Sequence, residues 1–126
     1  MTSEPSVLVE DVMTAPLETI SANATVREGA VRMREREINA LFVPGSSAGI
    51  VTTTDVVAAV AEERDLASLQ VRDVMTAPVE RITTAEELTE AAAMMTTFGI
   101  KHLPVVDADG DYVGMVSSTD LAVQLA

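Results

Sequence analysis

Apolar and polar residues follow the same order in the two halves of this chain. Alternating runs predict strands, and apolar residues three and four apart predict helices. The first half predicts a helical turn at 9–13, strands at 17–20, 41–43 and 48–52, and helices at 26–38 and 56–63. The second half predicts strands at 79–82, 103–106 and 112–117, and helices at 85–98 and 119–125. Each half is therefore predicted to run strand, helix, strand, strand, helix.

A repeated hexapeptide indicates that the halves are two copies of one unit. Asp-Val-Met-Thr-Ala-Pro occupies 11–16 and returns, letter for letter, at 73–78, which is 62 residues later. Three residues are gained near 109–111, which marks a surface turn because loops tolerate insertions. We divide the chain into an N-terminal tail (1–8), repeat 1 (9–63), a connector (64–70) and repeat 2 (71–126).

Local sequence signals also predict where the longer helices begin and end. Thr25 and Glu28 have the spacing of a capping box, in which each side chain bonds the other residue's backbone N–H. Thr84 and Glu87 have the same spacing in the second copy. Gly99 follows the second of these helices, at a position where glycine accepts a positive φ.

Composition and charge exclude several classes of partner. The net charge is −12, and Lys101 is the only lysine. Because an acidic surface repels nucleic acid and anionic lipid, we expect neither as a partner. An acidic binding tail is one alternative, but the carboxylates are scattered rather than blocked. We favour a solvated acidic surface suited to a high-salt cytoplasm, as in a halophilic archaeon.

Catalytic and metal-binding constellations are missing from the pattern. There is no cysteine and a single histidine, so we expect no transition-metal site, no disulfide and no catalytic triad. The run 107–111 resembles the start of a calcium loop, but its sixth position is Tyr112 and its twelfth is Ser118, so a hairpin turn is favoured. Because these catalytic groups are missing, we expect that the protein is not an enzyme. No apolar run approaches 18 residues and the N-terminus lacks signal-peptide features, so we expect a cytoplasmic protein.

The ordered motifs resemble those of a known family. The chain is similar to a CBS domain in the order of four features: Asp-Val-Met-Thr, a capped helix, Ile-Lys-His-Leu-Pro-Val-Val-Asp and Gly-Met-Val-Ser-Ser-Thr-Asp. Two such domains in tandem resemble a Bateman module. The resemblance covers residues 8–126. It implies an α/β (α+β) fold with two tandem β-α-β-β-α repeats packed with pseudo-two-fold symmetry. It also implies a regulatory module that binds AMP, ADP or ATP, or else S-adenosylmethionine or NAD, and that commonly forms a homodimer.

A strand that leads into a helix gives each copy a candidate binding site. Helix starts carry unpaired N–H groups and a positive dipole, which suit a phosphate, and an Asp carboxylate can accept hydrogen bonds from a ribose diol. The family resemblance implies these roles for two sets of residues: Thr52, Thr54 and Asp55, and Ser117, Thr119 and Asp120. The alternative is that these residues only cap their helices and need no ligand.

The two copies differ beside these helix starts. Lys101 and His102 precede a buried strand of the second copy, where the family often uses basic residues to reach phosphate, whereas the first copy has Asn39 and Ala40. Solvent exposure of Lys101, and a His102 that donates to a backbone carbonyl, are the alternatives.

Ile38 and Ile100 are expected to line adenine slots, although either could be ordinary core. Pro44 and the shorter first hairpin depart from the family pattern, so we expect one competent site, or two unequal ones.

Three functions remain in view, of which an enzyme is disfavoured because the nucleophile, base and metal ligands are missing. The first is a ligand-sensing module that biases a partner protein in trans, since we expect no fused effector domain. The second is a ligand-free scaffold for dimerisation or protein interaction, through helix faces such as Val56, Val57 and Val60 or residues 91–95. The hydroxyl and carboxylate residues present in both copies favour the first.

Overall fold

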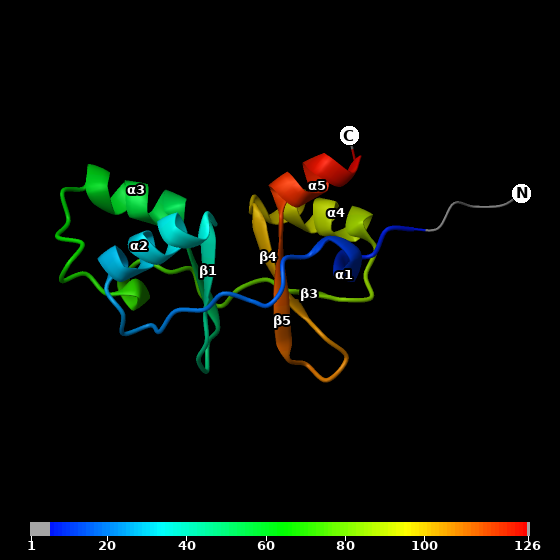
Figure 1. Ribbon diagram of the computed structural model, residues 1–126, viewed down its shortest axis with the longest axis horizontal. Coiled ribbons are helices and arrows are strands. Elements are labelled where there is room, and N and C mark those ends of the chain that lie inside the picture. The colour runs from blue at the N-terminus through cyan, green and yellow to red at the C-terminus, as the bar shows by residue number, and fades with distance from the viewer. Residues whose placement is uncertain (1–5, 126) are drawn as a thin grey trace, which may run out of the picture. The chain divides into compact units, whose positions relative to one another are not determined.

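The computed structural model describes residues 6–125, which form two compact units (Figure 1). Unit 2 is Glu18–Val79, and unit 1 joins the segment that ends at Leu17 to the chain from Glu80 onward. Most of the predicted tail at 1–8, and residue 126 of the predicted second repeat, lie outside the described residues. The units therefore divide the chain differently from the repeats, because 9–17 belong with the second copy and 64–79 with the first.

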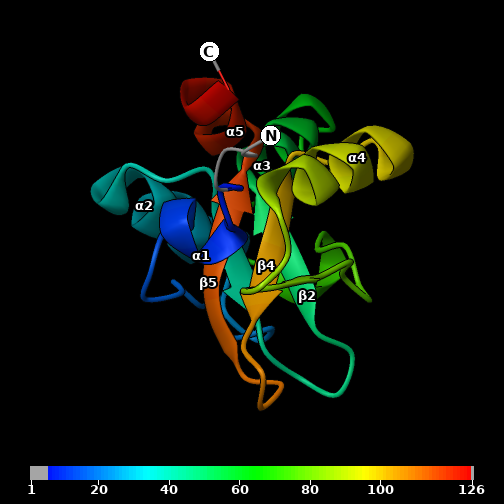
Figure 2. The same cartoon turned by 90° about the vertical axis from the view of Figure 1, so that its right-hand side faces the viewer.

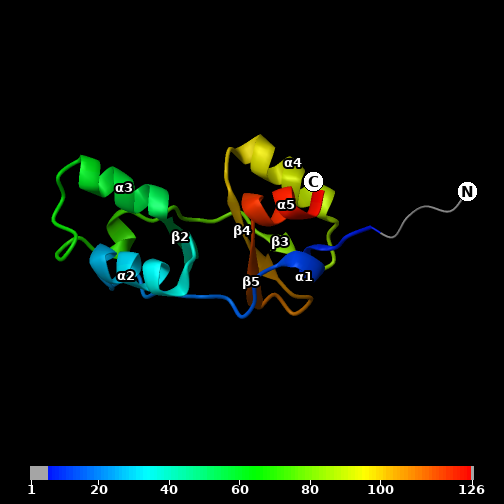
Figure 3. The same ribbon diagram turned by 45° about the horizontal axis from the view of Figure 1, so that its top comes forward.

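Unit 2 is built on a two-stranded hairpin with two helices. Its elements are α2 (Val26–Arg36), β1 (Ala40–Val43), β2 (Gly49–Thr52), α3 (Thr53–Ala61) and the 3₁₀ turn η1 (Val71–Asp73). β1 and β2 are antiparallel, with Ala40 opposite Thr52. The helices α2 and α3 lie side by side in Figures 1 and 3.

Unit 1 repeats this plan with a larger sheet. Its elements are α1 (Val9–Val12), β3 (Ile82–Thr83), α4 (Leu88–Phe98), β4 (His102–Val106), β5 (Tyr112–Ser117) and α5 (Ser118–Leu125). β3 is parallel to β4, and β4 is antiparallel to β5 with an irregularity between Val105 and Val106. The mixed α+β arrangement predicted from the sequence is confirmed.

The repeated hexapeptide contributes an edge to the sheet formed by the other copy. Thr14 forms an antiparallel bridge with Met115 of β5, and Thr76 forms the equivalent bridge with Ile50 of β2. Both bridges have paired N–H···O bonds of 2.8–3.0 Å. Each unit thus contains one copy's helices and hairpin, and the other copy's hexapeptide.

Glycines permit this close crossing of the hexapeptide over the strand. A Cβ on Gly114 would lie 2.8 Å from the sulfur of Met13 and 2.8 Å from the Thr14 carbonyl oxygen. A Cβ on Gly49 would lie 2.9 Å from the sulfur of Met75. These separations are shorter than ordinary van der Waals contacts, so a larger residue would push the hexapeptide away.

Each unit has an aliphatic core of its own. In unit 1 the core joins Val9 of α1 to Leu88, Leu103 and Val116, all almost fully buried. In unit 2 it consists of two clusters of buried residues: Ile20, Met33, Leu41, Val43, Val51 and Val71, and Val26, Ala59 and Leu69. Among the described residues, no helix is long and apolar enough to cross a membrane.

Some predicted elements differ in length. The strand expected at 17–20 is reduced to a single parallel bridge between Thr19 and Phe42, and the strand expected at 79–82 is Ile82–Thr83. The helix expected at 56–63 begins earlier, at Thr53, and ends at Ala61. The helix expected to reach Ile38 ends at Arg36, because Glu37 adopts the left-handed conformation.

The capping-box predictions had different outcomes. Thr25 and Glu28 form the predicted box, with reciprocal bonds of 3.1 Å. The box predicted for Thr84 and Glu87 is wrong, since α4 begins at Leu88 with Glu87 as its N-cap and no side-chain cap. Instead, the Val7 carbonyl accepts the N–H of Leu88 at 2.9 Å, so a distant segment of unit 1 satisfies this helix start.

Candidate functional site

In unit 2, strand β2 passes directly into helix α3 through a tight cap. The Asp55 carboxylate accepts the Thr52 backbone N–H at 2.8 Å and the Thr52 hydroxyl at 3.1 Å, through the same oxygen, Oδ2. Extended geometry at Thr52 followed by helical geometry at Thr53 brings these groups together. An acidic side chain in the first turn also complements the positive end of the helix dipole.

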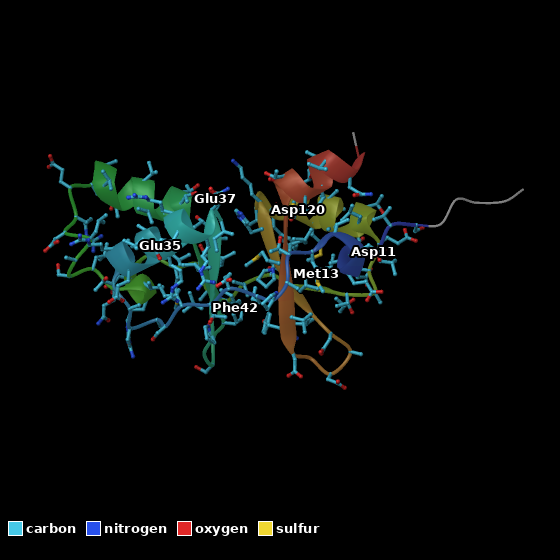
Figure 4. The ribbon with its side chains drawn as sticks, viewed as in Figure 1. Asp11, Met13, Glu35, Glu37, Phe42 and Asp120 are labelled. Carbon is cyan, nitrogen blue, oxygen red and sulfur yellow. The ribbon has the colours of Figure 1, made fainter. Side chains whose placement is uncertain are left out.

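Unit 1 builds the same cap where β5 meets α5. Asp120 Oδ2 accepts the Ser117 N–H at 2.8 Å, and the Asp120 N–H donates to Ser117 Oγ at 3.2 Å. Figure 4 shows Asp120 at the beginning of α5. The capping alternative raised by the sequence therefore describes part of what these residues do in both units.

Each cap leaves several polar groups free. Among the described residues, the second carboxylate oxygen of Asp55 and that of Asp120 accept no hydrogen bond. The backbone N–H and hydroxyl of Thr54 and Thr119, both exposed, also have no partner in the described part of the chain. One carboxylate oxygen and two donors thus remain at each helix start, which suits a ligand with both a diol and an anionic or polar group.

The hydroxyls of Thr52 and Ser117 both take part in the caps, but in different roles. Thr52 donates its hydroxyl to Asp55, and Ser117 accepts from Asp120, so both take part in the caps. Both are partly buried, whereas Thr54 and Thr119 face solvent. The Thr52 hydroxyl hydrogen is used in its cap, whereas that of Ser117 can still donate. The exposed hydroxyls of Thr54 and Thr119 are the more accessible donors.

The residues before β1 and β4 are held against the helix starts by the backbone. The Asn39 carbonyl accepts the Thr53 N–H at 3.0 Å, and the Lys101 carbonyl accepts the Ser118 N–H at 2.8 Å. These bonds satisfy the first N–H of each helix. They also fix Asn39 and Lys101 at equivalent positions beside their sites, so the difference between the copies lies at the site itself.

His102 occupies a half-buried position next to Asp120. It lies opposite Ser117 in the β4–β5 ladder. Burial lowers the pKa of His102 below its ordinary value of 6.5; the Asp120 carboxylate opposes this shift, and the Lys101 ammonium adds to it. Within the described residues the ring makes no hydrogen bond, so the carbonyl bond offered as an alternative role is not formed.

Ile38 and Ile100 occupy equivalent places, each just after the end of a long helix. The Ile38 N–H donates to Met33 and the Ile100 N–H to Met95, both at 3.0 Å. Each isoleucine is partly buried and packs against the core of its own unit. The core role proposed as an alternative is therefore present, and the remaining exposed part is the portion that could contact a ligand.

The predicted site residues fall into two sets, one in each unit. Unit 2 holds Ile38, Thr52, Thr54 and Asp55, whereas unit 1 holds Ile100, Lys101, His102, Ser117, Thr119 and Asp120. The two hairpins differ in length, but this difference lies away from the helix starts and does not change the geometry of the caps. Figure 2 shows the 107–111 turn at the end of β4 and β5 opposite to α4 and α5, and the cap bond to the Asp is 2.8 Å in both units.

Comparison with a family model decides which family has this architecture. The model described as the CBS domain matches residues 9–62 and again residues 71–126, which together are most of the chain. The chain belongs to the CBS-domain family. It contains a tandem CBS pair, as the order of motifs predicted.

Relatives of this CBS pair include short proteins and large enzymes. An uncharacterised 17.7 kDa protein of Acidianus ambivalens is 35% identical over 117 residues, covering 90% of this chain and 70% of its own. A homoserine O-acetyltransferase of Methanocorpusculum labreanum is 37% identical over 119 residues, covering 91% of this chain but only 23% of the enzyme. The CBS pair thus spans about a quarter of that relative's length.

A solved CBS pair resembles this chain along nearly its whole length. The CBS domain pair of protein MJ0100, in complex with 5′-methylthioadenosine and S-adenosyl-L-methionine, has a TM-score of 0.86 and 27% sequence identity. The match covers 96% of this chain and 97% of that one. Both small molecules bound to that protein contain adenosine.

Proposed function

We propose that this chain is a cytoplasmic, non-catalytic regulatory module that binds an adenosine-containing ligand and signals to a partner protein in trans. The ligand is of the AMP, ADP or ATP class, with S-adenosylmethionine or NAD as further possibilities. The observation that carries the proposal is that the capping Asp of each unit uses only one of its two carboxylate oxygens in the cap. In each, one Asp oxygen holds the backbone and the other is free beside an unpaired N–H.

The chemistry of an adenosyl ligand fits these free groups. A ribose presents two adjacent hydroxyls, which can donate to the free oxygen of Asp55 or Asp120. The exposed N–H and hydroxyl of Thr54 or Thr119 can donate to the 5′ substituent. A hydrogen bond to a charged group contributes about 1.5–3 kcal/mol, so the carboxylate accounts for much of the selectivity for a diol.

A thermal-unfolding panel tests whether any adenosyl ligand binds. AMP, ADP, ATP, S-adenosylmethionine, 5′-methylthioadenosine and NAD are each added to the wild type and to the double variant Asp55→Asn/Asp120→Asn. A ligand at a hundred times its Kd adds about 2.7 kcal/mol to the free energy of unfolding, which raises the midpoint. Asparagine keeps one oxygen for the cap bond but loses the charge and the second acceptor.

The expected result is a higher midpoint for the wild type with at least one ligand, and a much smaller shift for the double variant. The control is 2′-deoxyadenosine 5′-phosphate, which lacks the diol and should shift the wild type less than AMP does. If no ligand of the panel moves the wild-type midpoint, the proposed function is wrong.

A second candidate function is supported by exposed apolar residues on two helices. Val57 and Val60 of α3 are 66% and 58% exposed, and Val123 of α5 is 74% exposed. Such residues favour a contact with another protein, including a second copy of this chain as in the expected homodimer. A CBS scaffold of this kind would need no ligand, and it is the better interpretation if the panel fails.

A further inference from the structure

The two helix starts have matching caps but differ in the charge beside them. The inference that follows rests on the proposed function, because it concerns which adenosyl ligand each site accepts. Both caps hold their Asp at 2.8 Å from the backbone N–H of the strand's last residue. The caps differ in the role of the hydroxyl, but both present one Asp carboxylate, so the difference in formal charge comes from the neighbouring residues.

In unit 1 the neighbours can neutralise an anion. The Lys101 backbone is bonded to the first residue of α5, and Lys101 itself is exposed. Among the described residues its ammonium forms no ion pair, so it is available to a ligand. His102 adds one ring N–H donor, since its lowered pKa keeps the imidazole neutral, and it lies opposite Ser117 of the cap. A phosphate beside the free Thr119 N–H would thus have a cation and a further donor nearby.

In unit 2 the equivalent positions carry no cation. Asn39 is bonded to the first residue of α3 in the same way as Lys101 to α5, and Ala40 lies opposite Thr52 as His102 lies opposite Ser117. The nearest arginine in the sequence, Arg36, is already paired with Glu18 at 2.6 Å. The chain just before Asn39 contains Glu37, which Figure 4 shows at the end of α2. These positions in unit 2 therefore offer a phosphate no cation.

An AMP phosphate carries close to two negative charges at neutral pH. Lys101, beside the α5 start, can compensate this charge, whereas Asn39 and Ala40 offer no cation beside the α3 start. The uncharged thioether of 5′-methylthioadenosine is not repelled by a carboxylate, and the sulfonium of S-adenosylmethionine is attracted to one. We propose that the unit 1 site accepts an adenosyl ligand with a 5′-phosphate, and that the unit 2 site accepts one whose 5′ group is uncharged or cationic.

Calorimetric titration of the full chain with AMP and with 5′-methylthioadenosine tests this assignment. The two probes share adenosine and differ only at the 5′ position. AMP should bind the wild type and Asp55→Asn alike but lose at least tenfold in affinity in Asp120→Asn. 5′-Methylthioadenosine should bind the wild type and Asp120→Asn alike but lose at least tenfold in affinity in Asp55→Asn. If one variant abolishes both ligands, or if each ligand occupies both units equally, the assignment is wrong although the proposed function stands.

Two exposed substitutions exchange the copies' residues without touching the caps. Lys101→Asn should weaken AMP binding about tenfold and leave 5′-methylthioadenosine unchanged. Asn39→Lys should create AMP binding in unit 2, so that two AMP molecules bind per chain instead of one. An unchanged AMP affinity in Lys101→Asn together with an unchanged stoichiometry in Asn39→Lys would overturn the assignment.

Ionic strength supplies a readout that uses the wild type alone. Raising KCl shortens the range of charge interactions, so AMP affinity should fall with salt while 5′-methylthioadenosine affinity should not. Equal salt dependence of the two ligands would contradict the charge argument. Failure of both ligands to bind at any salt concentration would instead contradict the proposed function from which this inference starts.

Discussion

His102 is the residue whose environment makes the sharpest prediction at the residue scale. Burial disfavours its protonated form, Lys101 adds to that effect, and Asp120 only partly offsets it, so the pKa lies below 6.5 in the folded protein. In the unfolded chain the pKa returns to its ordinary value. As the pH falls below 6.5, the unfolded state therefore binds a proton more readily, and the free energy of unfolding decreases.

The chain has a single histidine, so its titration is unambiguous by NMR. We expect the midpoint of the His102 ring signals to lie below 6.5 in the folded protein. We also expect wild type, compared with His102→Asn, to lose stability in urea unfolding between pH 7.5 and 5.5. Lys101→Asn should raise the midpoint, because it removes a neighbouring cation. A midpoint at or above 6.5 would mean that the ring is solvated or paired more strongly with Asp120.

At the scale of elements, the ends of α2 and α4 provide a matched comparison. Gly99 ends α4 with φ of 65°, and Glu37 ends α2 in the same left-handed conformation with φ of 55°. A residue with a Cβ is strained there by about 1 kcal/mol relative to glycine. Both ends make the same following bond, from Ile38 to Met33 and from Ile100 to Met95.

We therefore expect Glu37→Gly to raise the free energy of unfolding, and Gly99→Ala to lower it, each by about 1 kcal/mol. Urea unfolding of both variants measures the effects. The control is Gly29→Ala in the interior of α2, where an added Cβ would have ordinary contacts and helix propensity favours alanine. If Glu37→Gly is destabilising, the Glu37 side chain makes a contribution that its exposure does not suggest.

The elements were predictable where the pattern is local. The internal repeat, with an offset of 62 residues that becomes 65 after the three-residue gain, placed the hairpin strands and long helices. Thr25 with Glu28 formed the box that their spacing predicts. The box at Thr84 failed because a carbonyl distant in sequence, that of Val7, satisfies the helix start. The site residues were grouped by motif, but the sequence could not show that Thr52 and Ser117 are used in the caps.

At the scale of the whole molecule, the exchange of the hexapeptides was beyond the sequence. Because the two copies are identical at 11–16 and 73–78, their letters do not show which sheet each one joins. The bridges from Thr14 to Met115 and from Thr76 to Ile50 resolve this choice. Each unit depends on residues from both repeats, so neither repeat alone contains a complete core.

A pair of core substitutions tests this exchange. Val9 and Val71 are equivalent in the two copies and both are fully buried, but Val9 packs in unit 1 and Val71 in unit 2. Truncation to alanine should cost about 2 kcal/mol in each case. Hydrogen exchange should accelerate first in β4 and β5 for Val9→Ala, and first in β1 and β2 for Val71→Ala. The reverse pattern would place each residue with its own repeat.

The regulatory role requires that the chain bind an adenosyl ligand through the free oxygens of Asp55 and Asp120. The most direct measurement is a calorimetric titration of the wild type and of Asp55→Asn/Asp120→Asn with AMP and 5′-methylthioadenosine. We predict saturable binding to the wild type, and at least a tenfold loss of affinity in a double variant that remains folded. Equal binding by both proteins would place the ligand elsewhere, and the absence of heat from either ligand in the wild type would contradict the adenosyl-binding function itself.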